Sequence, residues 1–144
     1  MVKKIKTKGT ICLVGGCFDI LHPGHVVFLQ KAKKQADFLI VLLENDQRVK
    51  ELKGVNRPVH TQKQRAQILS ALKFVDYVVM LPYLKGEEEY DAVIQKIKPD
   101  VIAVTRGTNT RHHQRSARKI GAGLVYVARI ANHSSSAILT SRSK

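Results

Sequence analysis

The sequence predicts a single α/β domain with three layers, in which helices cover both faces of a mostly parallel, five-stranded sheet. Five short apolar runs, rich in Val, Ile and Leu, recur along the chain without alternating polar residues. Such runs are typical of parallel strands that are buried on both faces. Segments with helical periodicity separate them, and this alternation indicates a Rossmann-like arrangement. The length of 144 residues fits one such domain, residues 1–144, with its own core.

The first expected strand ends in two glycines, Gly15 and Gly16. The strands are expected over residues 10–16, 37–43, 75–81, 100–104 and 123–128. In sheets of this class, ligands bind beyond the carboxyl ends of the strands, near a change in strand order. We therefore expect the segment 15–25, which follows the first strand, to lie at a ligand site.

Helices are expected between the strands and after the last one, over residues 22–36, 61–75, 87–100, 111–123 and 134–142. In the first helix, Leu29, Ala32 and Ala36 share one face with His25.

The second helix is expected to begin after Thr61 as N-cap and to bury a stripe of Ile68, Leu72 and Val75. The third carries acids in its first turn and stops at Pro99, and the fourth ends at Gly121.

The chain is strongly basic, with 25 Lys and Arg against 11 Asp and Glu and a net charge of +14. This balance favours anionic partners: nucleic acid, an acidic membrane surface or phosphorylated small molecules. Part of the charge belongs to residues 1–8, which are expected to form a solvated tail. The longest apolar run, residues 38–43, is too short to span a bilayer, and no hydrophobic signal follows the basic N-terminus. We expect a cytoplasmic protein without a membrane partner, in which Cys12 and Cys17 are unpaired.

The segment 15–25 reads GGCFDILHPGH, which is a strand end, a turn and the start of a helix. Pro23 suits the first helical position, and the N-terminus of a helix attracts phosphate. His22 and His25 are three residues apart, so both imidazoles face one way and can donate hydrogen bonds to phosphate oxygens, most strongly when charged. A helix cap with a buried histidine is the structural alternative. A zinc site with Cys17 lacks the usual ligand framework, and no metal site is predicted.

This stretch resembles the first signature of the HxGH nucleotidyltransferase superfamily, which is the cytidylyltransferase-like group. The resemblance implies that His22 and His25 bind a nucleoside triphosphate and stabilise the transition state. It also implies nucleotide contacts from the residues around them, which are Gly16, Cys17, Phe18, Asp19 and Gly24.

Residues 52–79 are most similar to the nucleotidyltransferase domain of ADP-heptose synthases of lipopolysaccharide core biosynthesis. Glycerol-3-phosphate cytidylyltransferases and archaeal-type FAD synthases are further relatives. The resemblance implies that Lys53 and Arg57 face phosphates, Lys53 with a catalytic role. Arg65 matches an arginine of the family pattern, and a structural ion pair is its alternative.

A second signature lies in RIANHSSSAIL, residues 129–139. The serines read as the N-cap of a last helix, where hydroxyl and N–H groups hold phosphate. The resemblance implies that Arg129, Ser134, Ser135 and Ser136 hold the β- and γ-phosphates, with Arg129 counted among the catalytic residues.

The segment 105–115 departs from the family pattern. Gly107 keeps its place as a nucleotide-binding residue, but Thr108 stands where relatives carry an acid. The segment is strongly basic and includes His112 and His113, which are expected to diverge on a helix. It either binds an anionic acceptor or forms a solvated surface.

Together these features predict transfer of a nucleoside monophosphate, preferably AMP from ATP, to a phosphorylated small molecule such as a sugar phosphate, with release of pyrophosphate. FMN adenylyltransferase and CTP-dependent cytidylyltransferase activities are alternatives within the class, and a basic nucleic-acid-binding module is the alternative from another class. Mg²⁺ is expected to arrive with the triphosphate. Relatives are often homodimers, so a homodimer is also expected.

Overall fold

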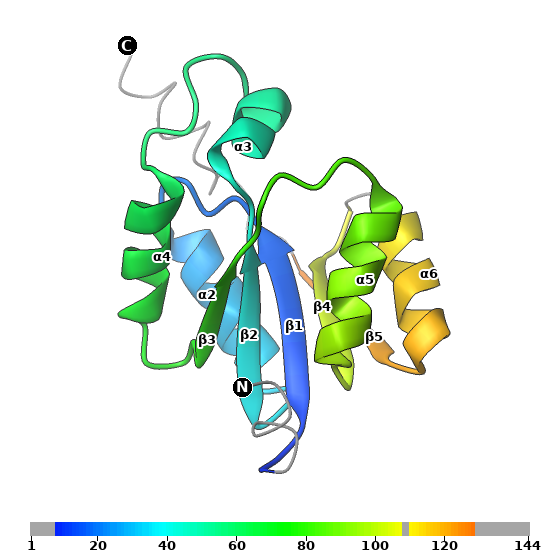
Figure 1. Cartoon of the computed structure of the whole chain (residues 1–144). Coiled ribbons are helices and arrows are strands. Elements are labelled where there is room, and N and C mark those ends of the chain that lie inside the picture. The colour runs from blue at the N-terminus through cyan, green and yellow to red at the C-terminus, as the bar shows by residue number, and fades with distance from the viewer. Residues whose placement is uncertain (1–7, 108–109, 129–144) are drawn as a thin grey trace.

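The computed structural model describes residues 8–107 and 110–128 (Figure 1). The elements in chain order are β1 (Ile11–Gly16), α2 (Pro23–Lys33), β2 (Phe38–Leu43), α3 (Asp46–Lys53), α4 (Gln62–Ser70), β3 (Tyr77–Met80), α5 (Glu87–Ile97), β4 (Val101–Thr105), α6 (Arg111–Ile120) and β5 (Gly123–Val127). The expected helix over 134–142 falls outside the part of the chain that the structure describes.

The five strands form one sheet in the order β3-β2-β1-β4-β5, and every pairing is parallel. Helices α2 and α4 lie on one face, and α5 and α6 lie on the other (Figure 1). The chain runs outward from β1 to β3 and then returns to the other side of β1 with β4. This change of direction puts the topological switch point between β1 and β4, where ligands bind in sheets of this type.

Successive residues of the central strands alternate between two cores, as the period of two requires. Leu13 of β1 packs toward α5 and α6, and its neighbour Val14 packs toward α2 and α4. Both are 2% exposed or less. Because both faces are covered, β1 and β2 are apolar throughout, which is why their sequences carry no alternation.

The second expected helix begins as predicted but buries a different face. Thr61 caps α4 in a reciprocal capping box with Gln64. Ile68, expected in the buried stripe, is 37% exposed, whereas Arg65 and Leu69 are at most 1% exposed. Within α4, a buried arginine replaces an apolar residue on the inner face. Leu72 and Val75, the other two residues of the expected stripe, follow the end of α4 and do pack in the core.

Helix α3 was not expected from the sequence. Its N-cap is Asn45, whose side chain accepts a hydrogen bond from the backbone N–H of Arg48. Val49 is its one buried residue, so the segment has no apolar periodicity to reveal a helix. The helix lies over the carboxyl ends of the strands (Figure 1).

The guanidinium of Arg65 joins three segments at the carboxyl edge of the sheet. It donates hydrogen bonds to the backbone carbonyls of Cys17 and Glu44, each at 2.8 Å, and to that of His60 at 3.0 Å. It also pairs with the carboxylate of Asp46 at 2.7 Å. Arg65 is fully buried. The structural alternative from the sequence is therefore the one observed, and Arg65 fixes the loops that frame the site.

We expect Arg65→Met to destabilise the fold by about 3 kcal/mol or more, because it leaves three part-buried carbonyls without their side-chain donor and removes the ion-pair partner of Asp46. Lys63→Met, at an exposed position of the same helix, is the matched control and is expected to change stability by less than about 0.5 kcal/mol. Urea denaturation of the two variants and the parent measures both effects. Equal stabilities for the two variants would contradict the role given to Arg65.

Candidate active site

His22 and His25 lie together at the start of α2, directly beyond β1. His22 is the N-cap, and its Nδ1 accepts a hydrogen bond from the backbone N–H of His25 at 3.4 Å. Pro23 occupies the first turn, as predicted. The two imidazole rings are stacked, with centroids 3.7 Å apart and planes inclined by 22°. The pair therefore presents two ring systems at a helix N-terminus, where free N–H groups favour an anion.

The His25 imidazole is uncharged at neutral pH in the ligand-free protein. Burial lowers its pKa to about 4, and the neighbouring His22 and the positive charge of Lys53 act in the same direction. Its Nδ1 is buried and has no hydrogen-bond partner among the described residues. The sequence argument treated a charged imidazole as the strongest donor. With its pKa lowered in this way, His25 becomes charged near neutral pH only when a bound anion stabilises the imidazolium.

The turn between β1 and α2 has a close-packed backbone. Phe18 is buried and adopts a positive φ of 45°. Its ring lies where a side chain on Gly16 would be, since a Cβ there would come within 2.8 Å of the ring. Gly16 thus allows Phe18 to fold back against the strand end. Gly24, the second residue of α2, lies next to His25 in the same turn.

Asp19 and Arg57 form a buried ion pair that ties this turn to the segment before α4. Arg57 Nε lies 2.6 Å from the Asp19 carboxylate, and both side chains are at most 6% exposed. The same carboxylate accepts hydrogen bonds from the N–H groups of Val59 and His60 at 2.8 to 2.9 Å. Burial by itself would raise the Asp19 pKa, but these donors outweigh it and hold the pKa below its usual range.

The predicted nucleotide contacts of Asp19 and Arg57 stay predictions. The observed contact gives the two residues a positioning role, because it holds the segment 57–60 against the β1–α2 turn.

Lys53 is the exposed last residue of α3. Its positive charge acts on the His25 imidazole and on the Cys17 thiol and lowers the pKa of each. Burial has the larger effect on the Cys17 thiol and raises its pKa. Both cysteines are free, as predicted. Helix α3 thus brings a cation to the site that the turn residues alone do not supply.

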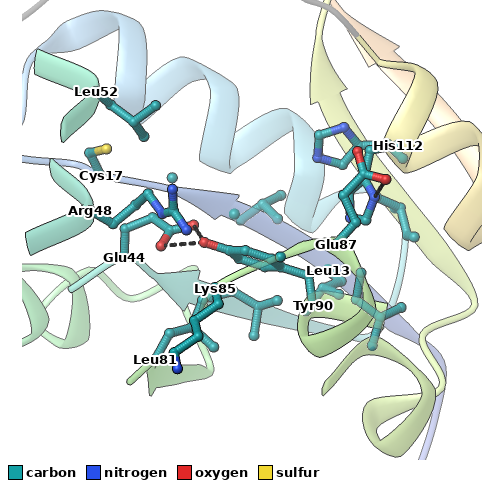
Figure 2. Close-up of a pocket in the computed structure, with 18 residues that line it drawn as sticks. Leu13, Cys17, Glu44, Arg48, Leu52, Leu81, Lys85, Glu87, Tyr90 and His112 are labelled. Carbon is teal, nitrogen blue, oxygen red and sulfur yellow. Dashed lines mark hydrogen bonds and ion pairs between the residues drawn. The ribbon is translucent and has the colours of Figure 1, made fainter. Parts of the chain in front are cut away.

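A cavity of about 550 Å³ lies on the α5 and α6 side of the same strand ends (Figure 2). Gly15 and Gly16 at the end of β1 and Cys17 of the following turn form part of its wall, and much of the rest is apolar, with Leu13, Leu42, Leu81, Ile94 and Ile102. This size is typical of sites for small molecules. The strand end of β1 therefore separates the histidine pair from a cavity that is large enough for a second reactant.

One end of the cavity carries a carboxylate held by a tyrosine. Tyr90 of α5 reaches toward Glu44, and its hydroxyl lies 2.9 Å from each carboxylate oxygen (Figure 2). Burial raises the Glu44 pKa and raises the Tyr90 pKa to about 12, the latter with the help of the hydrogen bond. Tyr90 is therefore a hydroxyl donor at neutral pH.

His112 and His113, expected to diverge, both line this cavity. Their ring centroids are 5.7 Å apart, and the ring of His112 also meets that of Tyr90 edge-on. They begin α6 at the carboxyl edge, where adjacent side chains of a first turn border the same opening. Burial lowers the His113 pKa. The basic segment thus supplies cavity wall and is more than a solvated surface.

Other cations of α6 are paired with acids of α5. Arg115 lies 2.6 Å from the Glu87 carboxylate, and Lys119 lies 2.9 Å from that of Asp91. Asp91 also accepts a hydrogen bond from the Ser116 hydroxyl. These pairs offset part of the positive charge of α6 on which the nucleic-acid alternative rests.

Of the remaining predicted site residues, the structure describes Gly107. Gly107 follows β4 at the carboxyl edge with φ of 90°, a conformation that favours glycine. Arg129, Ser134, Ser135 and Ser136 lie outside the described residues, so their predicted phosphate contacts stay predictions.

No group of three His, Cys, Asp or Glu side chains in residues 8–107 and 110–128 is arranged to hold a metal ion. None of the helices found within those ranges has the length and apolar character needed to cross a membrane.

The model of the cytidylyltransferase-like family matches residues 13–138, a span that includes the histidine pair, the residues that line the cavity and all but the last residue of the second signature. The chain belongs to the cytidylyltransferase-like family. The predicted resemblance and the predicted enzyme class, nucleotidyltransferase, are thereby confirmed.

The bifunctional protein HldE of several bacteria is similar to most of this chain. The protein from Campylobacter fetus is 50% identical over 93 residues, which are 65% of this chain and 19% of that protein. The protein from Wolinella succinogenes is 47% identical over 103 residues, 71% of this chain and 21% of that protein. The chain thus spans about a fifth of the length of these relatives.

Solved structures share the architecture. The lipopolysaccharide core biosynthesis protein from Thermoplasma volcanium superposes with a TM-score of 0.66 at 26% identity, over 85% of this chain and 97% of that one. The pantoate-β-alanine ligase from Francisella tularensis, solved with β,γ-ATP and β-alanine, gives a TM-score of 0.61 at 16% identity, over 91% of this chain and 66% of that one. The second likeness shows the fold alone. The predicted Rossmann-like class is confirmed.

Sequence reasoning missed the polar residues of the cavity wall, chiefly Glu44, Arg48 and Tyr90. Glu44 carried a usable signal, because it is the first polar residue after a buried strand and so had to lie at the carboxyl edge. Tyr90 carried none, since its direction depends on how α5 packs against the sheet.

We expect Asp19→Asn to destabilise the protein by about 3 kcal/mol at pH 7, because an amide removes the buried negative charge that faces Arg57 and accepts from two backbone N–H groups. The pKa of Asp19 is lowered in the folded state, so its contribution is present above the unfolded pKa of about 3.9 and is lost as the pH falls below that value. Urea denaturation between pH 7 and pH 3 should show the two proteins converging. Glu88→Gln, at an exposed position, is the control, and a pH-independent difference for Asp19→Asn would contradict the assignment.

Proposed function

We propose that the protein transfers AMP from ATP to a phosphorylated small molecule, preferably a sugar phosphate, and releases pyrophosphate. The observation that carries this proposal is the stacked pair His22 and His25 at a helix N-terminus, separated by one strand end from a cavity. One side suits a triphosphate and the other suits an acceptor. The two meet over the backbone of Gly15 and Gly16.

The reaction we propose is an in-line displacement. A phosphate oxygen of the acceptor forms a bond with the α-phosphorus of ATP, and the bond from that phosphorus to the bridging oxygen of pyrophosphate breaks. His22 and His25 donate hydrogen bonds to the phosphate oxygens as negative charge shifts in the transition state. Lys53 contributes positive charge from α3. Positioning and electrostatic stabilisation account for the rate, without a covalent intermediate on the protein.

The predicted second signature has a part in this proposal. Arg129 and Ser134 to Ser136 would hold the β- and γ-phosphates until pyrophosphate leaves, as hydroxyl and N–H groups at a helix start favour phosphate. Mg²⁺ would come with the triphosphate and screen its charge, because phosphate oxygens and water are its preferred ligands.

The preference for ATP and a sugar phosphate is supported by the relatives. The HldE proteins and the Thermoplasma lipopolysaccharide core biosynthesis protein are similar over most of the chain. CTP as donor, or FMN as acceptor, would be compatible with the same histidine pair. We also propose a cytoplasmic location, consistent with two free cysteines, and a homodimer.

Pyrophosphate release tests the reaction. ATP and CTP are each combined with mannose 1-phosphate, other sugar phosphates, glycerol 3-phosphate, FMN or phosphopantetheine. We expect ATP with a sugar phosphate to give the highest rate. Salt-dependent binding of DNA or RNA without pyrophosphate release from any pair would instead favour the nucleic-acid alternative.

We expect His25→Ala to fold and to lose at least 10²-fold in turnover, because one donor to the transition-state charge is removed. Gln30→Ala, at an exposed position of the same helix, is the control and should keep the parental rate. Single-turnover rates at saturating ATP give the comparison. Parental turnover by His25→Ala would rule out the proposed mechanism.

We expect the His25 imidazole to titrate with a pKa of about 4 in the free protein and higher with pyrophosphate bound, since the anion stabilises the imidazolium. Proton NMR of the imidazole across pH 3 to 8, assigned with the His25→Ala variant, measures both values. The proposed phosphate contact predicts a pyrophosphate-induced rise, and an unchanged pKa at saturating pyrophosphate would argue against it.

A further inference from the structure

We propose that Glu44, positioned by Tyr90, recognises hydroxyl groups of the acceptor, so that the cavity selects an uncharged, polyhydroxylated group attached to the reacting phosphate. This inference rests on the proposed function and names the acceptor class of its second site. It starts from a feature outside the predicted motifs, which is a half-buried carboxylate in a largely apolar cavity.

The backbone of Glu44 is fixed at the carboxyl edge. Its N–H donates to the carbonyl of Gly16 at 3.0 Å, and its own carbonyl accepts a hydrogen bond from Arg65 at 2.8 Å. Its side chain therefore projects from a rigid point beside the β1–α2 turn. A ligand that touches Glu44 lies next to the turn where the acceptor phosphate must meet the triphosphate.

The Glu44 carboxylate has more acceptor capacity than its protein contacts use. An ionised carboxylate has about four lone-pair sites, and the single Tyr90 hydroxyl supplies one proton. The positive charge of Arg48 also acts on this carboxylate and lowers its pKa, whereas the rest of the nearby wall is formed by side chains such as Leu42, Leu81 and Ile94, which donate nothing. A ligand with several hydroxyl donors satisfies the carboxylate in place of the water that it displaces.

The cavity carries charges of both signs. Glu44 and Glu87 line it together with Arg48 and Lys85, and Glu87 is also paired with Arg115 at 2.6 Å. Arg48 lies beside Glu44 (Figure 2). Because these charges offset one another, neither an anionic nor a cationic group gains a net attraction there. Hydroxyl groups on a ring or chain of carbons fit both the carboxylate and the apolar wall.

Matched ligand pairs test this without a variant. Mannose 1-phosphate, glucose 1-phosphate and glycerol 3-phosphate are compared by calorimetry with cyclohexyl phosphate and propyl phosphate, which have similar size and charge but lack the hydroxyls. We expect the best hydroxylated ligand to bind at least about tenfold more tightly than its matched analogue, because its hydroxyl groups form hydrogen bonds with the charged Glu44 carboxylate and the analogue cannot. Equal binding, or a preference for phosphocholine over all of these, would overturn the inference.

Variants then assign the preference to Glu44. Glu44→Gln is expected to remove most of the tenfold preference and to leave cyclohexyl phosphate binding unchanged. Tyr90→Phe should reduce the preference by less, because the carboxylate remains but loses its orienting partner. Glu88→Gln, an exposed acid of α5, is the control and should behave as the parent. A preference that survives in a folded Glu44→Gln protein would overturn the role of Glu44.

The outcomes separate this inference from the proposed function. Pyrophosphate release with no hydroxyl preference would leave nucleotidyl transfer in place and overturn the acceptor assignment. A hydroxyl preference lost in Glu44→Gln, with no pyrophosphate release from ATP or CTP, would support the cavity assignment and contradict the proposed reaction.

Discussion

The buried guanidinium of Arg65 is the interaction on which the functional edge of this protein depends. Parallel strands end with unpaired carbonyl groups, and three segments must turn there without regular hydrogen bonding. Arg65 supplies rigid donors to Cys17, Glu44 and His60 and a counter-charge to Asp46. A fixed, planar fork suits this task better than a lysine. The turn that carries the histidines and the start of α3 are therefore held by one side chain.

The acidic residues of this basic chain have distinct uses. Asp19 is buried and fully engaged with Arg57 and backbone N–H groups, so it shapes the turn. Glu44 is held by Tyr90 and still faces the cavity. Although the net charge is +14, the site is not simply a positive surface. His25 is uncharged when ligand-free, and part of the charge of α6 is paired with α5. The positions of individual charged groups, more than the net charge of the chain, determine the electrostatic environment on each side of β1.

The switch point between β1 and β4 brings these parts together. The turn after β1 carries the histidines, α3 after β2 carries Lys53, and α6 after β4 carries His112 and His113. All of them lie beyond carboxyl ends of adjacent parallel strands. Family membership and this topology agree on the location of the site. The segment 105–115, which departs from the family pattern, contributes His112 and His113 to the wall of the cavity in which we propose that the acceptor binds.

Patterns in the amino-acid sequence were enough to predict the α/β class, the approximate strand positions, the cap at Thr61 and the histidine pair at the start of a helix. These depend on local periodicity and on turn and cap chemistry, which act over a few residues. Tertiary structure decided the inner face of α4, the existence of α3 and the polar end of the cavity. Arg65 is buried only because Cys17, Glu44 and Asp46, which are 19 to 48 residues away, meet around it. Likewise, Tyr90 reaches Glu44, 46 residues away, only when α5 packs on the sheet, and no local pattern encodes that contact.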